Sequence, residues 1–413
     1  MSALQTKPAP LTPAARRILA ARFWRSIAQG ALVVDMALYL NALGWSGTAI
    51  GGVLSGGGLA GAFFGLAIGF VSDRFGRKRF LLAYEAIGCV CGLVAFITSN
   101  TPLLAAAVVL GGFGRGANGA AGPFAPAEDA WLAECVEPLE RGYVFSLKSA
   151  IGFAGMAAGA LLAMLPALWV NALGTAGSHR PLFLLVILGN AANLFILGNA
   201  PEKKLTQTPT VDKTLPEPRK ETGRENKFLR HLMAINVLNG LAVGLTGPLM
   251  SYWFAVRFHV GATVIAPVMA VSFLSVAAVA MISGELGRRI GMVNVMLWSR
   301  WGGLGLMLIL PLMPIYALAA IVHIVRSAIV SGTIGTRQAL VVCAVRDERR
   351  GLASSLNTFS GRLPQSIGPT LAGMFIGAGW FVTPFYIAAA FQAAYALLFE
   401  RLFRQVEHRL NDK

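Results

Sequence analysis

Twelve long apolar segments, separated by short polar turns, run through almost the whole chain. They are expected near residues 23–44, 47–71, 80–99, 102–125, 143–165, 181–199, 230–255, 262–284, 292–312, 315–338, 352–376 and 379–400. An α-helix needs roughly 20 apolar residues to cross a bilayer. A helix satisfies its own backbone hydrogen bonds in lipid, and runs of this length are too long for barrel strands. The pattern therefore predicts an all-α membrane protein with twelve transmembrane helices.

The composition excludes several other classes of protein. Of the 413 residues, 13% are charged and 55% are hydrophobic, whereas soluble domains carry about 25% charged residues. The four cysteines lie in or at the ends of apolar segments, with neither a disulfide framework nor a zinc pattern. We find no nucleotide-binding loop, metalloprotease motif or soluble domain in the sequence. We therefore expect no enzyme, no cofactor and no metal.

The basic residues indicate how the chain lies in the membrane. Lys and Arg number 35 against 19 Asp and Glu. Predicted inner turns hold basic clusters such as 74–79 and 346–350, whereas the predicted outer turns 45–48 and 98–102 carry no charge. This positive-inside pattern predicts an inner (plasma) membrane protein with both termini cytoplasmic. The net charge of +16 then faces lipid headgroups, so we expect a monomer in a lipid bilayer and no nucleic acid partner.

One long polar segment, 201–227, divides the chain into two halves, 1–200 and 228–413. The halves repeat each other, since residues 140–142 (Glu-Arg-Gly) match 349–351 (Arg-Arg-Gly) at an offset of 209. The same offset aligns glycines of the fifth and eleventh segments. The repeat predicts two pseudo-symmetric six-helix bundles joined by a mobile cytoplasmic linker.

The turn after the second segment carries a family signature. Residues 69–79 read Gly-Phe-Val-Ser-Asp-Arg-Phe-Gly-Arg-Lys-Arg, and the pattern Gly-x-x-x-Asp-Arg-x-Gly-Arg-Lys resembles the loop of the major facilitator superfamily of secondary transporters. The resemblance implies the fold of that family and alternating access between the halves. It also implies a gating cluster, which comprises Asp73, Arg74, Gly76, Arg77, Glu134 and Arg141. The alternative is that the basic residues of the turn merely hold topology.

Ionisable residues inside the predicted spans mark a candidate transport site, because a charge in lipid is expensive and usually faces a cavity or a partner. Asp35 lies in the first span, where a buried carboxylate could carry a proton. Arg115 and Asn118 lie in the fourth, in a run that resembles the family pattern of an Arg followed by small residues. His323 and Arg326 occupy the corresponding part of the tenth span.

We expect the arginines at 115 and 326 to bind an anionic group bidentately or to steer a proton to Asp35. The alternative is that each arginine pairs with a nearby acid for structural reasons. For His323 the alternative is a hydrogen-bonded packing residue. For Asp35 it is a neutral or paired structural carboxylate near the outer end of its span.

Acids without a counterpart in the family pattern lie at the end of the fourth span. By the repeat, Glu128 corresponds to Arg337, and both lie where inner helix ends meet on closure of such transporters. We expect Glu128 or Asp129 to pair with Arg337 or with Lys148 as a latch. The alternative is that all four are ordinary surface charges.

Two further charges, Glu85 and Arg300, lie in the third and ninth spans. These spans are peripheral in the family that the chain resembles. We therefore expect both side chains to reach the inner membrane surface, with their stems along the helix.

The preferred function is proton-coupled export of small amphipathic compounds, as in drug/proton antiporters. Exporters of that kind often carry Gly-Pro-x-x-Gly-Gly in the fifth helix, and residues 159–164 (Gly-Ala-Leu-Leu-Ala-Met) depart from it. The alternative is import or export of a specific small metabolite or metal ion, with an anion at Arg115 and Arg326 or a cation at Asp35. A non-transporting receptor or a membrane enzyme is the remote alternative.

Overall fold

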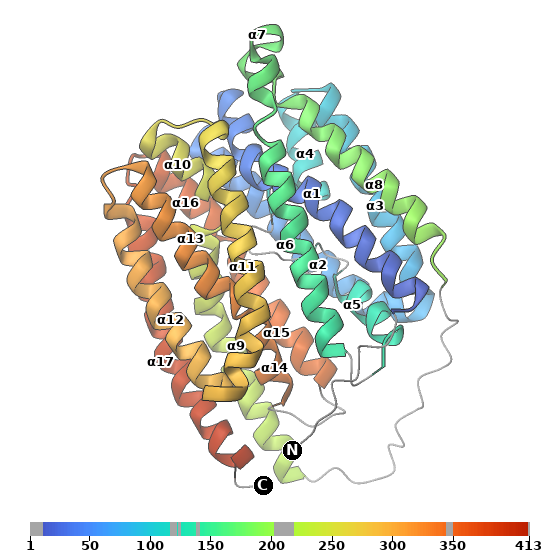
Figure 1. Cartoon of the computed structure of the whole chain (residues 1–413), viewed down its shortest axis with the longest axis vertical. Helices are drawn as coiled ribbons and strands as arrows, with labels where there is room; N and C mark the ends of the chain where they lie inside the picture. Colours follow the sequence, from blue (N-terminus) through green and yellow to red (C-terminus); the bar gives the residue numbers. More distant parts are fainter. Residues whose placement is uncertain are drawn as a thin grey trace.

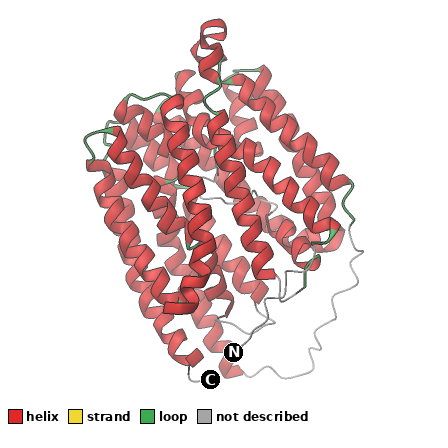
Figure 2. Cartoon of the chain, viewed as in Figure 1, coloured by secondary structure: helices red, strands yellow, loops and turns green. Residues whose placement is uncertain are grey.

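The computed structural model describes residues 11–115, 122, 125–137, 141–201, 219–343 and 350–411. Throughout the described residues the regular secondary structure is helical (Figure 2). The first half contributes α1 (Pro13–Ala42), α2 (Gly47–Phe75), α3 (Arg77–Ile97), α4 (Thr101–Gly111), α5 (Ala125–Glu134), α6 (Arg141–Leu162), α7 (Pro166–Gly177), η1 (Arg180–Leu182) and α8 (Phe183–Gly198). The second half contributes α9 (Arg219–Thr246), α10 (Met250–Phe258), α11 (Ala262–Ile290), α12 (Met292–Ile309), η2 (Leu310–Leu312), α13 (Tyr316–Gly332), α14 (Ile334–Cys343), α15 (Arg350–Gln365), α16 (Gly368–Gly377) and α17 (Thr383–Asn411).

The outer surface of the bundle suits a membrane. Large apolar side chains point outward on several helices, including Val90 on α3, Phe195 on α8 and Trp298 on α12, which are 61%, 75% and 76% exposed. Among the described residues, eight helical stretches are long and apolar enough to cross a bilayer. The chain is therefore a multi-pass membrane protein.

The two halves lie side by side, with the first half in blue to green and the second in yellow to red (Figure 1). Helix α6 packs against α11, and α2 packs against α16. We call the end of the bundle where α8 ends at Gly198 and α9 begins at Arg219 the linker side. The other end, beyond which α7 projects, is the opposite side (Figure 1).

Close packing of small residues joins the halves toward the opposite side. A Cβ atom added to Gly51 of α2 would lie 2.1 Å from the carbonyl oxygen of Pro369 on α16. On the same two helices the hydroxyl groups of Ser55 and Thr370 are 2.7 Å apart. The Ser251 hydroxyl of α10 donates to the Val33 carbonyl of α1 at 3.3 Å. Helix backbones can approach this closely only where side chains are absent or small.

The fourth predicted span, 102–125, is wrong as a single helix. Helix α4 ends at Gly111, and Gly112 and Gly114 adopt left-handed backbone angles with φ of 68° and 72°. Glycine takes such angles without steric cost and commonly ends helices. Helix α5 begins only at Ala125, so Arg115 lies on non-helical backbone inside the bundle.

Two other elements differ from the sequence-based expectation. Helix α9 begins at Arg219, so the last nine residues of the predicted linker 201–227 are helical. Residues 202–218 of that linker lie outside the described part of the chain. Helix α7 forms where no span was predicted, with Pro166 at its start, a position that proline favours because its fixed φ suits a first turn.

Candidate functional site

Two neighbouring cavities share the lining residues Pro248, Arg362 and Gln365; residues of both halves line the first, and residues of the second half line the other. The first-half pocket is lined mainly by α1–α4 and has a volume of about 170 Å³. The second-half pocket is lined mainly by α9 and α11–α15 and has a volume of about 220 Å³. The two pockets adjoin at these shared residues, and we refer to them together as the central site.

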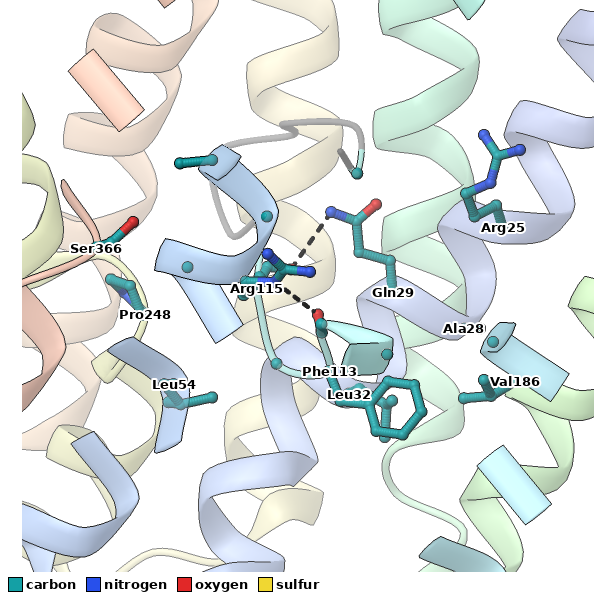
Figure 3. Close-up of a pocket in the computed structure, with 18 of the residues that line it drawn as sticks. Arg25, Ala28, Gln29, Leu32, Leu54, Phe113, Arg115, Val186, Pro248 and Ser366 are labelled. Atoms are coloured by element: carbon teal, nitrogen blue, oxygen red, sulfur yellow. Dashed lines mark hydrogen bonds between the residues drawn. The ribbon is translucent and has the colours of Figure 1, made fainter. Parts of the chain in front are cut away.

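Arg115 lies at the centre of the first-half pocket (Figure 3). Its guanidinium donates to the backbone carbonyls of Gly57 and Gly112, the latter at 3.1 Å. The Gln29 side chain donates to the Arg115 carbonyl at 3.3 Å. A Cβ atom on Gly61 would lie 1.9 Å from the Arg115 Nη1 atom. The glycines of α2 therefore leave the room that this side chain occupies.

A buried network of opposite charges lies behind the first-half pocket. Arg25 of α1 donates to Glu85 of α3 at 2.9 Å and to Glu128 of α5 at 2.5 Å. Lys148 of α6 lies 2.6 Å from Glu128 and 2.5 Å from Asp129. The Glu85 and Glu128 side chains are each 1% exposed. The network ties four helices together and compensates the charge of Arg25, which also lines the pocket.

The network contains one of the two pairings that the sequence predicted for a latch. Glu128 and Asp129 pair with Lys148 in the same half, while Arg337 donates to Asn236 at 3.1 Å and to Asn357 at 2.7 Å. In this conformation the acids are therefore paired with Lys148 within the first half, and Arg337 binds side-chain amides of the second half. Pairing across the halves in another conformation stays a prediction.

The expectation that Glu85 and Arg300 reach the membrane surface is wrong. Both are buried, at 1% and 3% exposure. Glu85 binds Arg25 inside the bundle, and Arg300 lines the second-half pocket. Polar groups inside the bundle stabilise each side chain there, so neither extends to the membrane surface.

The second-half pocket is lined by two arginines and a histidine that have few hydrogen-bond partners. Arg300 of α12 lies 3.5 Å from the Asn239 amide oxygen and 5.3 Å from the centre of the Tyr395 ring. Arg326 of α13 donates to the Met307 sulfur at 3.2 Å. His323 Nε2 lies 3.5 Å from the Ser327 hydroxyl. Three nitrogen atoms here are buried without a hydrogen-bond partner, namely Arg300 Nε, Arg326 Nε and His323 Nδ1.

The charge of the central site has one sign. Neither pocket has an aspartate or glutamate among its described lining residues, whereas both are lined by arginines. Those arginines are Arg25, Arg115, Arg300, Arg326, Arg337 and Arg362. An unpartnered buried donor costs about 1–3 kcal/mol, and more when it is charged. An anionic solute would remove that cost.

Asp35 lies apart from this site. It is 1% exposed and is not among the described lining residues of either pocket. Its carboxylate lies 2.7 Å from Nδ1 of His179, which precedes η1 on the opposite side. The Tyr39 and His179 rings are 5.8 Å apart. The sequence did not indicate this histidine, since 144 residues separate the partners.

The signature turn is described in part. Gly76 caps α3 with a φ of 91°, an angle that favours glycine. Arg77 and Glu134 form an ion pair of 2.6 Å between α3 and α5. Several predicted site residues lie outside the described residues or have side chains outside them, namely Asp73, Arg74, Asn118 and Arg141. A gating role for this cluster stays a prediction.

Two helical halves, a central cavity lined by apolar side chains and arginines, and an apolar outer surface are typical of a membrane carrier of small solutes. A family model, the Major Facilitator Superfamily, matches residues 18–233 and again 232–413. The chain belongs to the Major Facilitator Superfamily and is a secondary transporter, not an enzyme.

Solved structures agree with this fold. The nucleoside transporter NupG aligns with a TM-score of 0.69 at 14% identity, covering 94% of this chain and 99% of NupG. A D-xylose-proton symporter aligns at 0.68 and 15% identity, covering 93% and 96%. The human organic anion transporter MFSD10 (TETRAN) aligns at 0.63 and 16% identity, covering 94% and 100%. A comparison with curated protein sequences gave no match. Identities this low show the fold alone.

Proposed function

We propose that the chain transports a small organic anion through the central cavity by alternating access of its two halves. The observation that carries the proposal is the single sign of charge in the cavity. Arg115, Arg300 and Arg326 line it, and no described lining residue is acidic. Guanidinium groups bind carboxylate and phosphate groups through paired hydrogen bonds, so the cavity suits an anion.

The same charges disfavour a cationic solute. Two unit charges of like sign 4 Å apart repel by about 4 kcal/mol at an effective dielectric constant of 20. A metal cation or an amphipathic organic cation in the second-half pocket would meet this repulsion from Arg300 and Arg326. Neutral compounds would leave the buried donors unpartnered. The hypothesis that the solute is an anion therefore has more support than the hypothesis that it is a metal ion.

The contacts between the halves support alternating access. The contacts of Gly51 with Pro369 and of Ser55 with Thr370 bring the halves together toward the opposite side. We propose that these contacts open and the linker side closes as the halves, 1–200 and 228–413, rock about the cavity. We also propose that the linker side is cytoplasmic, in a cell inner membrane, because the basic turns lie there.

Proton-coupled export of amphipathic compounds is the second candidate. The contact between the buried Asp35 carboxylate and the partly buried His179 ring supports proton coupling, because a carboxylate beside an imidazole can take up and release a proton. The cavity charge supports an acidic rather than a basic amphipathic solute. Proton coupling and anion transport are compatible, and a proton-coupled organic anion carrier would satisfy both observations.

The test is flux into liposomes that contain the purified full-length protein. A panel of radiolabelled small anions, cations and neutral compounds is offered with and without a pH gradient. We expect anions to enter, and we expect Arg326→Gln to reduce their entry about 10-fold or more, since a hydrogen bond to a charged group is lost. Uptake of cations or neutral compounds alone would refute the proposal.

Arg257→Gln is the matched control for this substitution. Arg257 lies at the end of α10, over the rings of Phe258 and Phe381 at 5.6 Å and 5.8 Å. It is not among the described lining residues of either pocket. Anion entry should therefore stay near the wild-type rate in Arg257→Gln.

A further inference from the structure

We infer that the second-half pocket binds a doubly charged tetrahedral oxyanion, a phosphate monoester or a phosphonate, at Arg300, Arg326 and His323. The inference rests on the proposed transport of an organic anion, and it names the charged group and the side of the cavity that holds it.

The first argument is the number of donors without partners. Arg300 Nε, Arg326 Nε and His323 Nδ1 are buried and make no hydrogen bond. All three side chains line the same pocket. When the Ser327 hydroxyl donates to His323 Nε2, at 3.5 Å, the imidazole proton lies on Nδ1 and makes it a third donor. Buried donors without partners are rare in folded proteins and indicate an absent acceptor.

The second argument is the uncompensated charge. Arg326 and Arg300 repel each other electrostatically, as do Arg300 and Arg337. The hydrogen-bond acceptors of these arginines are the amides of Asn239, Asn236 and Asn357 and the sulfur of Met307, none of which carries a charge. One carboxylate would compensate a single arginine. A phosphate monoester carries about −1.5 to −2 at pH 7 and compensates most of two.

The third argument is the direction of approach. Arg300 comes from α12, His323 and Arg326 from α13, and Arg337 from α14, so the donors reach the pocket from different helices. A planar carboxylate offers two oxygen atoms in one plane. A phosphate or phosphonate offers three terminal oxygen atoms around a tetrahedral centre, which suits donors from several directions.

The donors are also held in place by neighbouring rings. The Arg300 guanidinium lies over the Tyr395 ring, and the His323 ring meets the Phe254 ring edge-on, with centroids 5.6 Å apart. Ring contacts of both kinds restrict side-chain rotation. A site whose donors are ordered before the ligand arrives loses less entropy on binding.

The organic part of the ligand would extend into the first-half pocket. The two pockets share Pro248, and the first is lined by apolar side chains that include Leu32, Leu54 and Phe113 (Figure 3). Apolar lining with a few convergent charges is usual for sites that hold small organic molecules. The arrangement therefore fits a short carbon chain or ring that ends in the oxyanion.

The experiment compares headgroups on one carbon chain. Binding of propyl phosphate, propylphosphonate, inorganic phosphate and butanoate to the full-length protein in lipid nanodiscs is measured by calorimetry at pH 8. We expect both organic phosphorus compounds to bind about 10- to 100-fold more tightly than butanoate, the range that one further charge-assisted hydrogen bond provides. Inorganic phosphate should bind more weakly than propyl phosphate, because it fills only the second-half pocket.

The variants Arg300→Gln and Arg326→Gln should each abolish the preference for phosphorus headgroups, whereas Arg257→Gln should keep it. Equal or tighter binding of butanoate by the wild-type protein would overturn the inference, and this comparison needs no variant to fold. A preference that survives in both well-folded variants would overturn it too. If butanoate binds and is transported while propyl phosphate is not, the oxyanion inference fails but anion transport stands. If neither class binds or crosses, anion transport itself fails.

Discussion

Replacing Glu128 by glutamine tests whether the buried charge network stabilises the first half. Glu128 is 1% exposed and lies 2.5 Å from Arg25 and 2.6 Å from Lys148. Breaking a buried ion pair by removing one partner costs about 3–5 kcal/mol, because the remaining charge is left uncompensated. Arg25 keeps Glu85 and Lys148 keeps Asp129. We therefore expect a loss of about 3 kcal/mol, the lower end of that range.

The same helix offers a matched control. Glu134 of α5 also forms an ion pair, with Arg77 at 2.6 Å, but its side chain is 45% exposed. Exposed ion pairs contribute about 0–1 kcal/mol, because solvent screens them. Glu134→Gln should therefore change the free energy of unfolding several-fold less than Glu128→Gln does.

The assay is denaturant unfolding of the purified protein in mild detergent, followed by tryptophan fluorescence. A further variant, Glu128→Gln with Lys148→Met, should recover part of the loss, because the uncompensated cation goes with its partner. Equal losses in Glu128→Gln and Glu134→Gln would refute the reasoning. They would mean that burial of the network adds no stability over an exposed pair.

Three other outcomes are expected. Gly61→Val should reduce anion uptake about 10-fold or more, since a Cβ atom there lies 1.9 Å from the Arg115 guanidinium. The control Gly52→Val lies on the same helix, where a Cβ atom has no neighbour within 4 Å, and should leave uptake unchanged. Equal uptake in the two variants would remove Arg115 from the site. Asp35→Asn should abolish accumulation driven by a pH gradient but keep exchange of labelled for unlabelled anion, and accumulation at the wild-type rate would exclude this carboxylate from coupling. Exchange of anions should exceed net efflux in rate, because an empty cavity keeps its arginine charges uncompensated; equal rates in liposomes at zero membrane potential would contradict this.

The fold could largely be predicted, because lipid imposes a simple rule on sequence. Each predicted span falls on a described helix or on successive helices, since only apolar helices meet the demands of the bilayer core. The exception, 102–125, is broken at Gly112 and Gly114. The glycine run 111–114 was visible in the sequence, but glycines also serve close helix packing, and the letters do not distinguish the two uses.

The candidate site could be predicted only in part. Arg115 and Arg326 were marked because a charge in a membrane span is expensive, and both line the cavity. Arg300 bears the same charge in a similar span but was expected at the surface. Hydropathy finds the span, but it does not say which face of the helix turns toward the cavity. That depends on packing between helices far apart in the chain.

Pairs of charges were the hardest features to predict. Arg25 and Glu128 are 103 residues apart, and Asp35 and His179 are 144 apart. The two sequence separations differ, so no regular spacing in the sequence indicates which residues pair. The internal repeat instead aligned Glu128 with Arg337, which lies in the other half and binds Asn236 and Asn357. Pseudo-symmetry relates positions in the fold, and equivalent positions need not touch.

The two halves treat their buried charges differently, and this difference bears on the transport cycle. In the first half, Arg25 and Lys148 are compensated by Glu85, Glu128 and Asp129, so the network needs no solute to be stable. In the second half, Arg300 and Arg326 have no acidic partner among the described residues. A solute that binds there changes the energy of the second half far more than that of the first. Arg115 is the first-half exception, because its guanidinium donates to backbone carbonyls, which carry no charge. We therefore propose that the anion is held by Arg115 from one side and by Arg300 and Arg326 from the other, with the larger gain in the second half.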